Sequence, residues 1–323
     1  MQLGENFEST LNNSIRNTCN ITPPCIAQDF RPFDLLWSIV FAAVAILSEI
    51  GNFLVLLVIF KNKTLQTTSN YFIASASITD MLMPIAYLLF VISSRQVGKK
   101  SSEETKIFQP TARFILDLSC AVSAQSLVAI SVHRFYAVFY PLKARLESFR
   151  TCFLIICFNW IIATVLYAPR LYYSSLGIND CLCTNDPLFK IRLIWDASYA
   201  VLIVVALAVV IVIYSRIIVH LKKTKIPGVS TSSSLHIARR KRENTRLSVM
   251  FIIISLVFFS SWFPFWLSIM LLRYFFVDGN CILEQVHSVI SILPGIQTSG
   301  NPLLFFTFST QFRQGLKSIF KFS

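Results

Sequence analysis

The sequence predicts an all-α membrane protein: a membrane bundle of seven transmembrane helices with a short amphipathic C-terminal helix. Three observations predict this fold class, namely the composition, seven long apolar runs and the distribution of basic residues. Of the 323 residues, 54% are hydrophobic and 14% are charged, whereas about 25% of the residues of a soluble domain are charged. So few charged groups cannot cover the surface of a soluble protein, and the same composition excludes a disordered chain.

Seven apolar runs are each long enough to cross the hydrocarbon core of a bilayer, which takes about 20 residues. The apolar cores of the first three runs each contain one acid: Glu49, Asp80 and Asp117. A membrane β-barrel would show alternating segments of about ten residues, which are absent from the sequence. A large soluble helical bundle would rarely contain seven such runs. We place the spans at 34–60, 69–94, 109–135, 151–171, 194–220, 243–273 and 284–308.

Basic residues concentrate on one side of these spans. If the C-terminal segment 309–323 is inside, the inner segments hold 18 of the 29 Lys and Arg residues and a net charge of +16, while the remainder of the chain carries −3. Cytoplasmic loops are enriched in Lys and Arg, so the N-terminal tail, residues 1–33, is expected outside. This tail has no apolar signal segment, and the first span is expected to serve as its own signal. The net charge of +13 then requires no nucleic acid as a partner.

The inner side is expected to meet both lipid and a cytosolic partner. The loop Lys222–Arg246 combines basic clusters with a run of Ser and Thr residues that are candidates for phosphorylation. In 309–323, apolar residues recur at helical spacing beside basic ones, which predicts an amphipathic helix on the inner leaflet. These residues are Phe312, Leu316, Ile319 and Phe320, with Arg313, Lys317 and Lys321 beside them.

The eight cysteines separate by predicted depth. Cys120, Cys152 and Cys157 lie within spans, and the other five lie on the outer side, where disulfides form. An odd number leaves at least one outer thiol unpaired within the set, and the connectivity stays open. Asn12 and Asn20 begin N-x-S/T sequences in the outer tail and are predicted glycosylation sites. The disulfide candidates are Cys19, Cys25, Cys181, Cys183 and Cys281.

Short motifs distinguish among a receptor, a transporter and a channel. They occur in this order: Gly51-Asn52, Ser75–Asp80, Ser131–Phe135, Trp160, Tyr214, Ser261–Pro264, Asn301–Phe305 and Phe312-Arg313. With these motifs, the chain from about 34 to 321 resembles the rhodopsin-like (class A) G-protein-coupled receptors. The resemblance implies a receptor that binds an extracellular ligand and activates a heterotrimeric G protein, with no catalysis. A transporter or channel would show internal repeats or charged rows, and neither is found.

The resemblance also implies a set of activation switches. Pro264 lies within the sixth span, where a proline kinks a helix, and the family uses this kink for an outward swing of the sixth helix. Arg134 is usually clamped by a neighbouring acid, but here the neighbour is His133, so a weaker restraint and raised basal activity are expected. Phe305 stands where the family usually has Tyr. The implied switch residues are His133, Arg134, Tyr214, Trp262, Pro264, Asn301, Pro302 and Phe305.

A carboxylate in the middle of a span, such as Asp80, is costly unless it faces the bundle interior and has partners there. A hydrogen-bonded structural acid is one interpretation. The resemblance implies another, an allosteric sodium site formed by Asp80, Ser123 and Asn301 with Asn52 nearby. All four side chains carry oxygen, which hard cations require. No other metal and no other cofactor is expected.

The candidate ligand residues lie at the outer ends of the spans. The acids Asp117, Asp196 and Glu284 favour a cationic ligand, and five residues add an apolar and aromatic lining: Cys120, Trp262, Phe265, Trp266 and His287. The stretch 134–143 resembles the neuropeptide-receptor branch, so a neuropeptide is the first expectation. A biogenic-amine or other small-molecule class A receptor is the alternative, because Asp117 stands one residue beyond the family's amine-binding position. A receptor without a ligand is a third reading.

The resemblance has one further departure and several further implications. Gln109 stands where the family has a third-span Cys that bonds the second outer loop, so Cys181 and Cys183 lack their usual partner. The expected location is the plasma membrane, with several spans and the N-terminus outside. The expected partners are a peptide ligand, a heterotrimeric G protein, receptor kinases, arrestin and membrane lipid.

Overall fold

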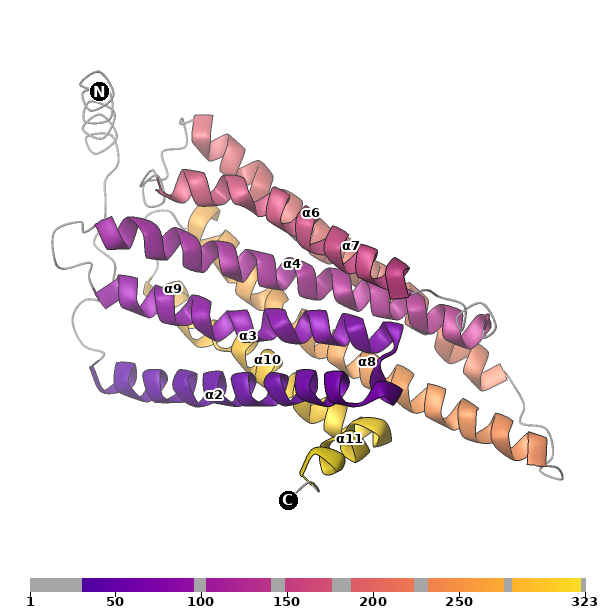
Figure 1. Ribbon diagram of the computed structural model, residues 1–323. Helices are drawn as coiled ribbons and strands as arrows, with labels where there is room; N and C mark the ends of the chain where they lie inside the picture. Colours follow the sequence, from indigo (N-terminus) through magenta and orange to yellow (C-terminus); the bar gives the residue numbers. More distant parts are fainter. Residues whose placement is uncertain are drawn as a thin grey trace, which may run out of the picture.

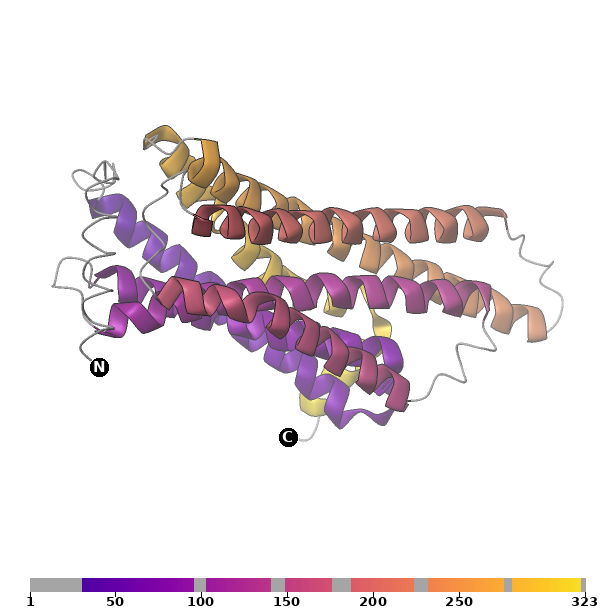
Figure 2. The same cartoon turned by 90° about the horizontal axis from the view of Figure 1, so that it is seen from above.

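The computed structural model describes residues 31–95, 103–140, 149–175, 187–223, 232–275 and 281–320. These residues form long helices that run side by side, with no strand among them (Figures 1 and 2). Eight predicted site residues lie outside the described part, either entirely or in their side chains. They are Asn12, Asn20, Cys19, Cys25, Cys181 and Cys183, together with the side chains of Cys281 and Glu284.

Six described helices are long and apolar enough to cross a membrane. Five of them extend beyond both ends of the predicted span, and α8 does so together with the turn η3 that follows it. The limits of the spans stay predictions, because the ends of a helix do not mark the surfaces of a membrane. The inner part of α8, for example, begins well before residue 243. The helices are α2 (Arg31–Lys61), α3 (Thr68–Arg95), α4 (Glu103–Phe139), α6 (Phe149–Ser175), α7 (Pro187–Lys223) and α8 (Ser232–Met270), with a 3-10 turn η2 (Lys63–Leu65) after α2 and a π-helical turn η3 (Leu271–Phe275) after α8.

The seventh element is divided, whereas the sequence suggested one continuous helix over 284–308. It consists of α9 (Cys281–Ile290) and α10 (Leu293–Phe308), with a turn at 291–292. Pro294 lies in the first turn of α10 and lacks the N–H that would bond the carbonyl of Ile290, so the helix is interrupted there. With α9 and α10 as its seventh member, the predicted all-α bundle is confirmed.

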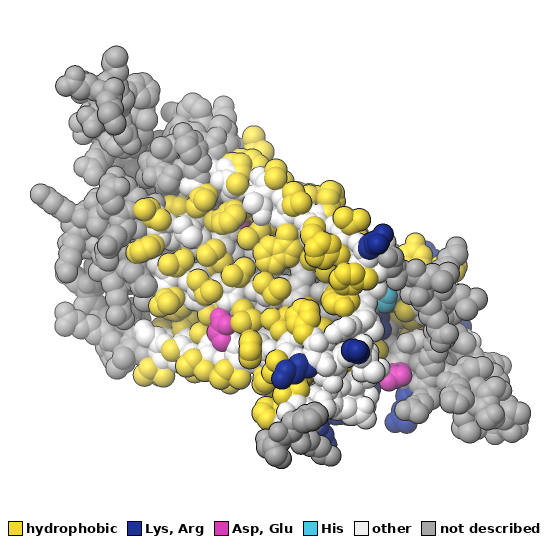
Figure 3. Space-filling view, viewed as in Figure 1, with side chains coloured by type: hydrophobic (Ala, Val, Ile, Leu, Met, Phe, Trp, Pro, Cys, Tyr) yellow, Lys and Arg dark blue, Asp and Glu magenta, His cyan; other side chains and the backbone are white. Residues whose placement is uncertain are grey.

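The flanks of the bundle are strongly apolar. Hydrophobic side chains cover the long face seen in Figure 3, while Lys and Arg gather toward the end of the molecule that carries α11. Large side chains such as Leu154 and Ile194, each 66% exposed, stand outward from α6 and α7. Such a surface is costly in water but matches the hydrocarbon core of a bilayer. The chain is therefore a multi-pass membrane protein.

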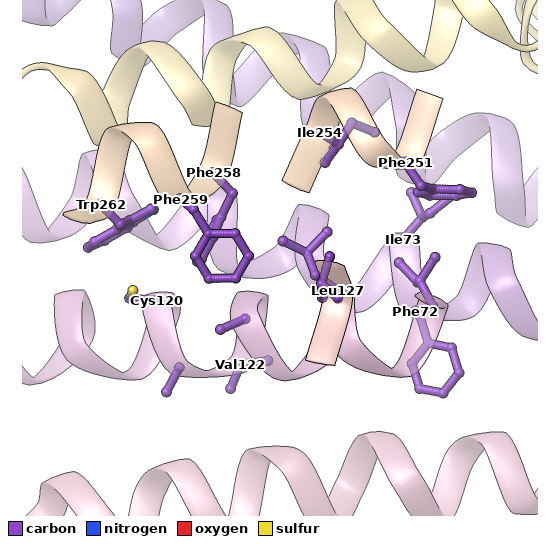
Figure 4. Packing of buried hydrophobic residues seen from close by; sticks show 14 of the residues in the cluster. Phe72, Ile73, Cys120, Val122, Leu127, Phe251, Ile254, Phe258, Phe259 and Trp262 are labelled. Atoms are coloured by element: carbon purple, nitrogen blue, oxygen red, sulfur yellow. The ribbon is translucent and has the colours of Figure 1, made fainter. Parts of the chain in front are cut away.

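The interior is packed by side chains of α8 against α4 and α3. Phe251, Phe258 and Trp262 point from α8 toward Leu127 and Cys120 of α4 (Figure 4), and all five are buried. These rings join the outer and inner halves of the bundle, because they follow one face of α8 along its length.

Close contacts tie α2 to its neighbours. A Cβ atom at Gly51 would lie 2.8 Å from Pro302 Cγ, so only glycine lets α2 approach α10 this closely. Pro84, inside α3, leaves the carbonyl of Asp80 without its helical donor, and Ser48 Oγ donates to that carbonyl at 3.2 Å. These contacts fix α2, α3 and α10 around Asp80.

The predicted amphipathic helix is α11 (Thr310–Phe320), which lies across the inner end of α2 (Figure 1). It buries Phe312 and Gly315. A Cβ at Gly315 would lie 2.8 Å from Val58 Cγ1, and Ser318 Oγ donates to Asn62 Oδ1 at 3.1 Å. The packing of α11 against α2 therefore depends on a glycine at this position.

Candidate functional site

A small cavity lies at the centre of the bundle, with a few polar side chains among a mainly apolar lining. Three of the four residues predicted to hold sodium, Asp80, Ser123 and Asn301, line it together with Ser77. Asn301 Nδ2 donates to Asp80 Oδ2 at 2.8 Å, and the hydroxyls of Thr79 and Ser123 lie 2.7 Å apart. The cavity volume is about 20 Å³, and a water molecule needs roughly 10–15 Å³ on this measure. A single water or small ion fits.

Asn52, the fourth predicted member, does not line this cavity. Its Nδ2 donates to the carbonyls of Ser48 at 2.9 Å and Thr298 at 3.1 Å, so it joins α2 to α10. The donor set of the cavity still suits a hard cation, because its polar groups are carboxylate, hydroxyl and amide oxygens. Two buried oxygens, Ser77 Oγ and Asn301 Oδ1, have no hydrogen-bond partner within the described ranges. They are available to a guest in the cavity.

At the inner end of α4, Arg134 packs on an aromatic ring instead of pairing with an acid. Its guanidinium carbon lies 5.0 Å from the centroid of the Phe251 ring of α8, a distance typical of cation–π contact. Arg134 Nε and the Tyr214 hydroxyl are both buried without a hydrogen-bond partner among the residues described. Arg134 is therefore held by a ring of α8 and has an unused donor.

His133, which replaces the family's usual acid, turns toward α3. Its Nδ1 lies 2.6 Å from Ser69 Oγ, so this side chain links α4 to α3. The side chain of Glu243 on α8 is exposed, and no ion pair between it and Arg134 is found in the described part of the chain. The weaker restraint on Arg134 and the raised basal activity both stay predictions.

A contact that the sequence analysis missed links the inner end of α8 to α10. The carbonyl of Thr307 accepts from Arg246 Nη2 at 3.2 Å and from Arg313 Nη1 at 2.6 Å. Basic side chains favour the C-terminal end of a helix, where carbonyls lack partners. The sequence analysis had named Arg313 as part of the Phe312-Arg313 motif. It had included Arg246 only as a basic residue of the segment 222–246.

The predicted aromatic lining of the ligand site forms one buried cluster in the outer half. Trp262 Nε1 donates to Gln297 Oε1 at 3.1 Å, and its ring meets Phe265 with centroids 5.8 Å apart. Phe265 also contacts Trp266 at 5.7 Å and stacks on His287 at 5.7 Å. The cluster thus joins α8 to α9 and α10.

Tyr199 extends this cluster to α7, and the sequence analysis missed it. Its ring lies 4.3 Å from that of Trp266, and its hydroxyl lies near Cys120 and Asp117 of α4. A buried tyrosine in an apolar span carries no motif, so only the packing reveals its place. Cys120 is itself fully buried, so it lies beneath the cluster and not on an open wall.

The acids expected near the outer opening are buried. Asp117 and Asp196 are 2% and 1% exposed, and Tyr274 of η3 donates to Asp196 Oδ2 at 2.7 Å. His287 Nδ1 lies 2.8 Å from Ser268 Oγ. Both acids therefore lie in the interior, and their part in binding a ligand stays a prediction.

The two prolines predicted to act in the switch lie inside helices, and their role in activation stays a prediction. Pro264 is inside α8 and Pro302 inside α10. Phe305 stacks on Phe312 of α11 with centroids 5.7 Å apart. A change at Trp262 would therefore reach α11 through α10, by way of Gln297 and Phe305.

A bundle of seven membrane elements, with a central cavity beside a buried Asp and an Arg at the inner end of its third member, defines a seven-transmembrane receptor. The model of the family "7 transmembrane receptor (rhodopsin family)" matches residues 51–305, and the chain belongs to this family. Its members are receptors and not enzymes.

Similar proteins include three receptors whose names state a ligand, which is a neuropeptide for two of them. Neuropeptide FF receptor 2 of Rattus norvegicus is 27% identical, over 85% of this chain and 70% of its own length. Neuropeptide FF receptor 1 of Homo sapiens is 23% identical, over 99% and 76%. Substance-K receptor of Homo sapiens is 26% identical, over 88% and 73%. The similarity thus extends across most of each chain.

Proposed function

We propose that this chain is a plasma-membrane receptor for an extracellular neuropeptide with a cationic group, and that the bound peptide leads it to activate a heterotrimeric G protein. The observation that carries the proposal is the burial of two acids, Asp117 near the Tyr199 hydroxyl and Asp196 bonded to Tyr274. A buried carboxylate attracts a cation strongly because water screens it little. The peptide receptors among the similar proteins support the ligand class.

The proposed mechanism begins at the bond between Tyr274 and Asp196. A cationic group that reaches Asp196 replaces the Tyr274 hydroxyl, and η3 and the outer end of α8 move with Tyr274. The aromatic cluster then repacks around Trp262, and the Pro264 kink passes this movement to the inner half of α8. The ligand acts by stabilising one of two states, to the extent of its differential affinity.

At the inner face, outward movement of α8 takes Phe251 away from Arg134. The guanidinium and the Tyr214 hydroxyl then become available to a G protein, which offers the hydrogen-bond acceptors that the bundle lacks. Phe305 has no hydroxyl group and therefore cannot form a hydrogen bond with either of these groups. The Ser- and Thr-containing segment 222–246 was predicted as a loop, but its residues from Ser232 onward belong to α8. This segment is the proposed target of receptor kinases and arrestin, and α11 is proposed to lie against membrane lipid.

The central cavity is the proposed sodium site. Asp80, Ser123 and Asn301 would hold the ion, whose charge would neutralise the buried carboxylate. The cavity is small, so movement of α10 toward α3 would remove the room for an ion. Occupancy therefore favours the state seen here, with Arg134 against Phe251.

The proposed topology places residues 1–33 outside the cell. Asn12 and Asn20 are then accessible for glycosylation, and the outer cysteines lie where disulfides form. The 18 inner Lys and Arg residues support this orientation.

Peptides of matched length that are cationic, neutral or acidic test the proposal in cells that express the full chain. Calcium and cyclic-nucleotide responses are recorded, and only cationic peptides are expected to act. Arg134→Ala should abolish the response while peptide binding persists. A response that survives Arg134→Ala, or silence toward all three peptide classes, would overturn the proposal.

A further inference from the structure

Glu49 is an acid that neither the ligand site nor the switch uses. It lies in the middle of the apolar stretch Leu36–Lys61 of α2, and its side chain is partly exposed. Figure 3 shows an acidic side chain among hydrophobic ones on the face over α2 and α3. The carboxyl group has no hydrogen bond or ion pair within the described segments. Acids at such a depth are costly and usually have a partner.

The depth of Glu49 excludes lipid headgroups as that partner. The stretch Leu36–Lys61 has 26 residues, and an α-helix rises 1.5 Å per residue. Glu49 is therefore about 20 Å from either end along the helix axis. A Glu side chain is too short to reach the interface over this distance, so a partner has to lie within the membrane.

The residues around Glu49 form a heptad pattern on the face of α2 that points away from the bundle. Large exposed residues recur every seven positions: Ile39, Ile46, Phe53 and Phe60, which are 57%, 58%, 55% and 57% exposed. Three residues after the first three of these stand Ala42, Glu49 and Leu56. A strict repeat of seven keeps one edge of a helix against a partner helix in a left-handed pair. Ala42 lies seven residues before Glu49, and its small side chain permits a partner helix to approach closely there.

We propose that α2 pairs in parallel with α2 of a second copy of this chain, with the two Glu49 carboxyl groups facing each other. In a parallel pair, identical residues of the heptad edge meet at the same level. A neutral carboxyl group has one donor and one acceptor, so the two groups satisfy each other in a medium that disfavours charge. The heptad edge supplies the apolar contact on both sides of this polar pair.

Energy transfer between copies tests the pairing. Full-length chains labelled on the C-terminal tail with a donor or an acceptor fluorophore are reconstituted in phosphatidylcholine vesicles at increasing protein density. The wild type should show transfer above that of random proximity. Glu49→Leu should weaken dimerisation about tenfold, the size typical of a polar contact between membrane helices. Glu49→Gln should keep most of the transfer, because an amide also donates and accepts.

Cysteine cross-linking provides a second measurement that does not alter Glu49. Ile46→Cys and Phe53→Cys on the heptad edge should form cross-linked dimers. Val204→Cys on α7, which is similarly exposed at 52%, is the matched control and should not.

Two results would overturn the proposal: equal transfer in the wild type and Glu49→Leu, or transfer at the random level in the wild type. A polyleucine helix with one central Lys tests the alternative that Glu49 pairs with a basic helix of another membrane protein. If it binds the wild type but not Glu49→Leu while the copies stay monomeric, the site serves a basic membrane helix instead of a second copy.

Discussion

The outer and inner halves of this receptor are held closed in different ways. In the outer half, polar side chains bond to one another, as between Tyr274 and Asp196 or Trp262 and Gln297. In the inner half, Arg134 rests on a ring, and its Nε and the Tyr214 hydroxyl have no partner among the described residues. A buried group without a partner costs about 1–3 kcal/mol. The outer half thus has hydrogen bonds that a ligand must replace, although the Tyr199 hydroxyl is buried there without a hydrogen-bond partner among the described residues. In the inner half, Arg134 Nε and the Tyr214 hydroxyl are open to a partner.

Because of this difference, a ligand at the outer half and a G protein at the inner half need different binding groups. A ligand has to replace hydrogen bonds that already exist, so it needs groups that equal or exceed them. A G protein needs only to offer acceptors to donors that are already desolvated. The movement of α8 connects the two, because it carries both Trp262 and Phe251.

The largest effect is expected from Asp196→Ala in the outer half. It removes the carboxylate that a cationic group would meet, and loss of one member of a buried charge pair costs about 2–5 kcal/mol. The potency of a cationic peptide should fall about 30-fold or more, as measured by concentration–response curves for G-protein activation.

Tyr274→Phe is the matched control for Asp196→Ala. It removes the competing hydroxyl but leaves the carboxylate in place, so potency should be kept or rise. Unchanged potency in Asp196→Ala would show that the outer acids do not hold the ligand, and the contrast between the two halves would lose its functional meaning.

The second effect concerns the cavity between the halves. Asp80→Asn removes the charge that a sodium ion needs, so basal and peptide-stimulated signalling should no longer depend on sodium. Nucleotide exchange on the G protein is compared in NaCl and in KCl at equal ionic strength. Asn52→Ala, which alters a residue outside the cavity, should remain sodium-sensitive. Equal sodium dependence in Asp80→Asn and the wild type would contradict the proposed site.

Much of the fold could be predicted because its signals are local. A long apolar run predicts a span, and Pro264 or Pro302 predicts a kink, whatever the neighbouring helices do. Motif order also placed Asp80 with Ser123 and Asn301. Contacts such as Tyr274–Asp196 and Arg246–Thr307 were missed because they join residues far apart in sequence. They depend on the rotation of each helix about its axis, and a long apolar run defines this rotation poorly.

The burial of Asp117 and Asp196 was missed for a related reason. Their positions toward the outer ends of the predicted spans gave no measure of burial, because side-chain packing decides how far an acid is covered. Tyr199 and Phe265 fill the space that the sequence analysis left for a ligand.

A smaller effect is expected at His133. His133→Asp would place an acid next to Arg134 and restore the family's usual ion pair. Because such a pair near the membrane surface contributes about 0.2–1 kcal/mol, basal G-protein activation should fall about two- to fivefold. His133→Asp both adds an acid and removes the contact with Ser69. Ser69→Ala removes only that contact between α3 and α4, so it separates the effect of the new charge from the effect of the lost contact. Basal output that does not fall in His133→Asp would refute the idea of a weak restraint.

The smallest effect is expected from Arg246→Gln, which tests how the inner end of α8 is held. Its bond to the Thr307 carbonyl is long, at 3.2 Å, and exposed to solvent, and an ordinary hydrogen bond contributes about 0.5–1.5 kcal/mol. Basal activation should rise about twofold, because Arg313 still occupies the same carbonyl at 2.6 Å. Arg242→Gln, one turn away on the same helix, is the control for loss of charge and should leave basal activation unchanged. A rise of the same size in both variants would mean that inner charge, and not the Thr307 bond, restrains α8. The inner half would then be held by the ring of Phe251 with no contribution from this bond.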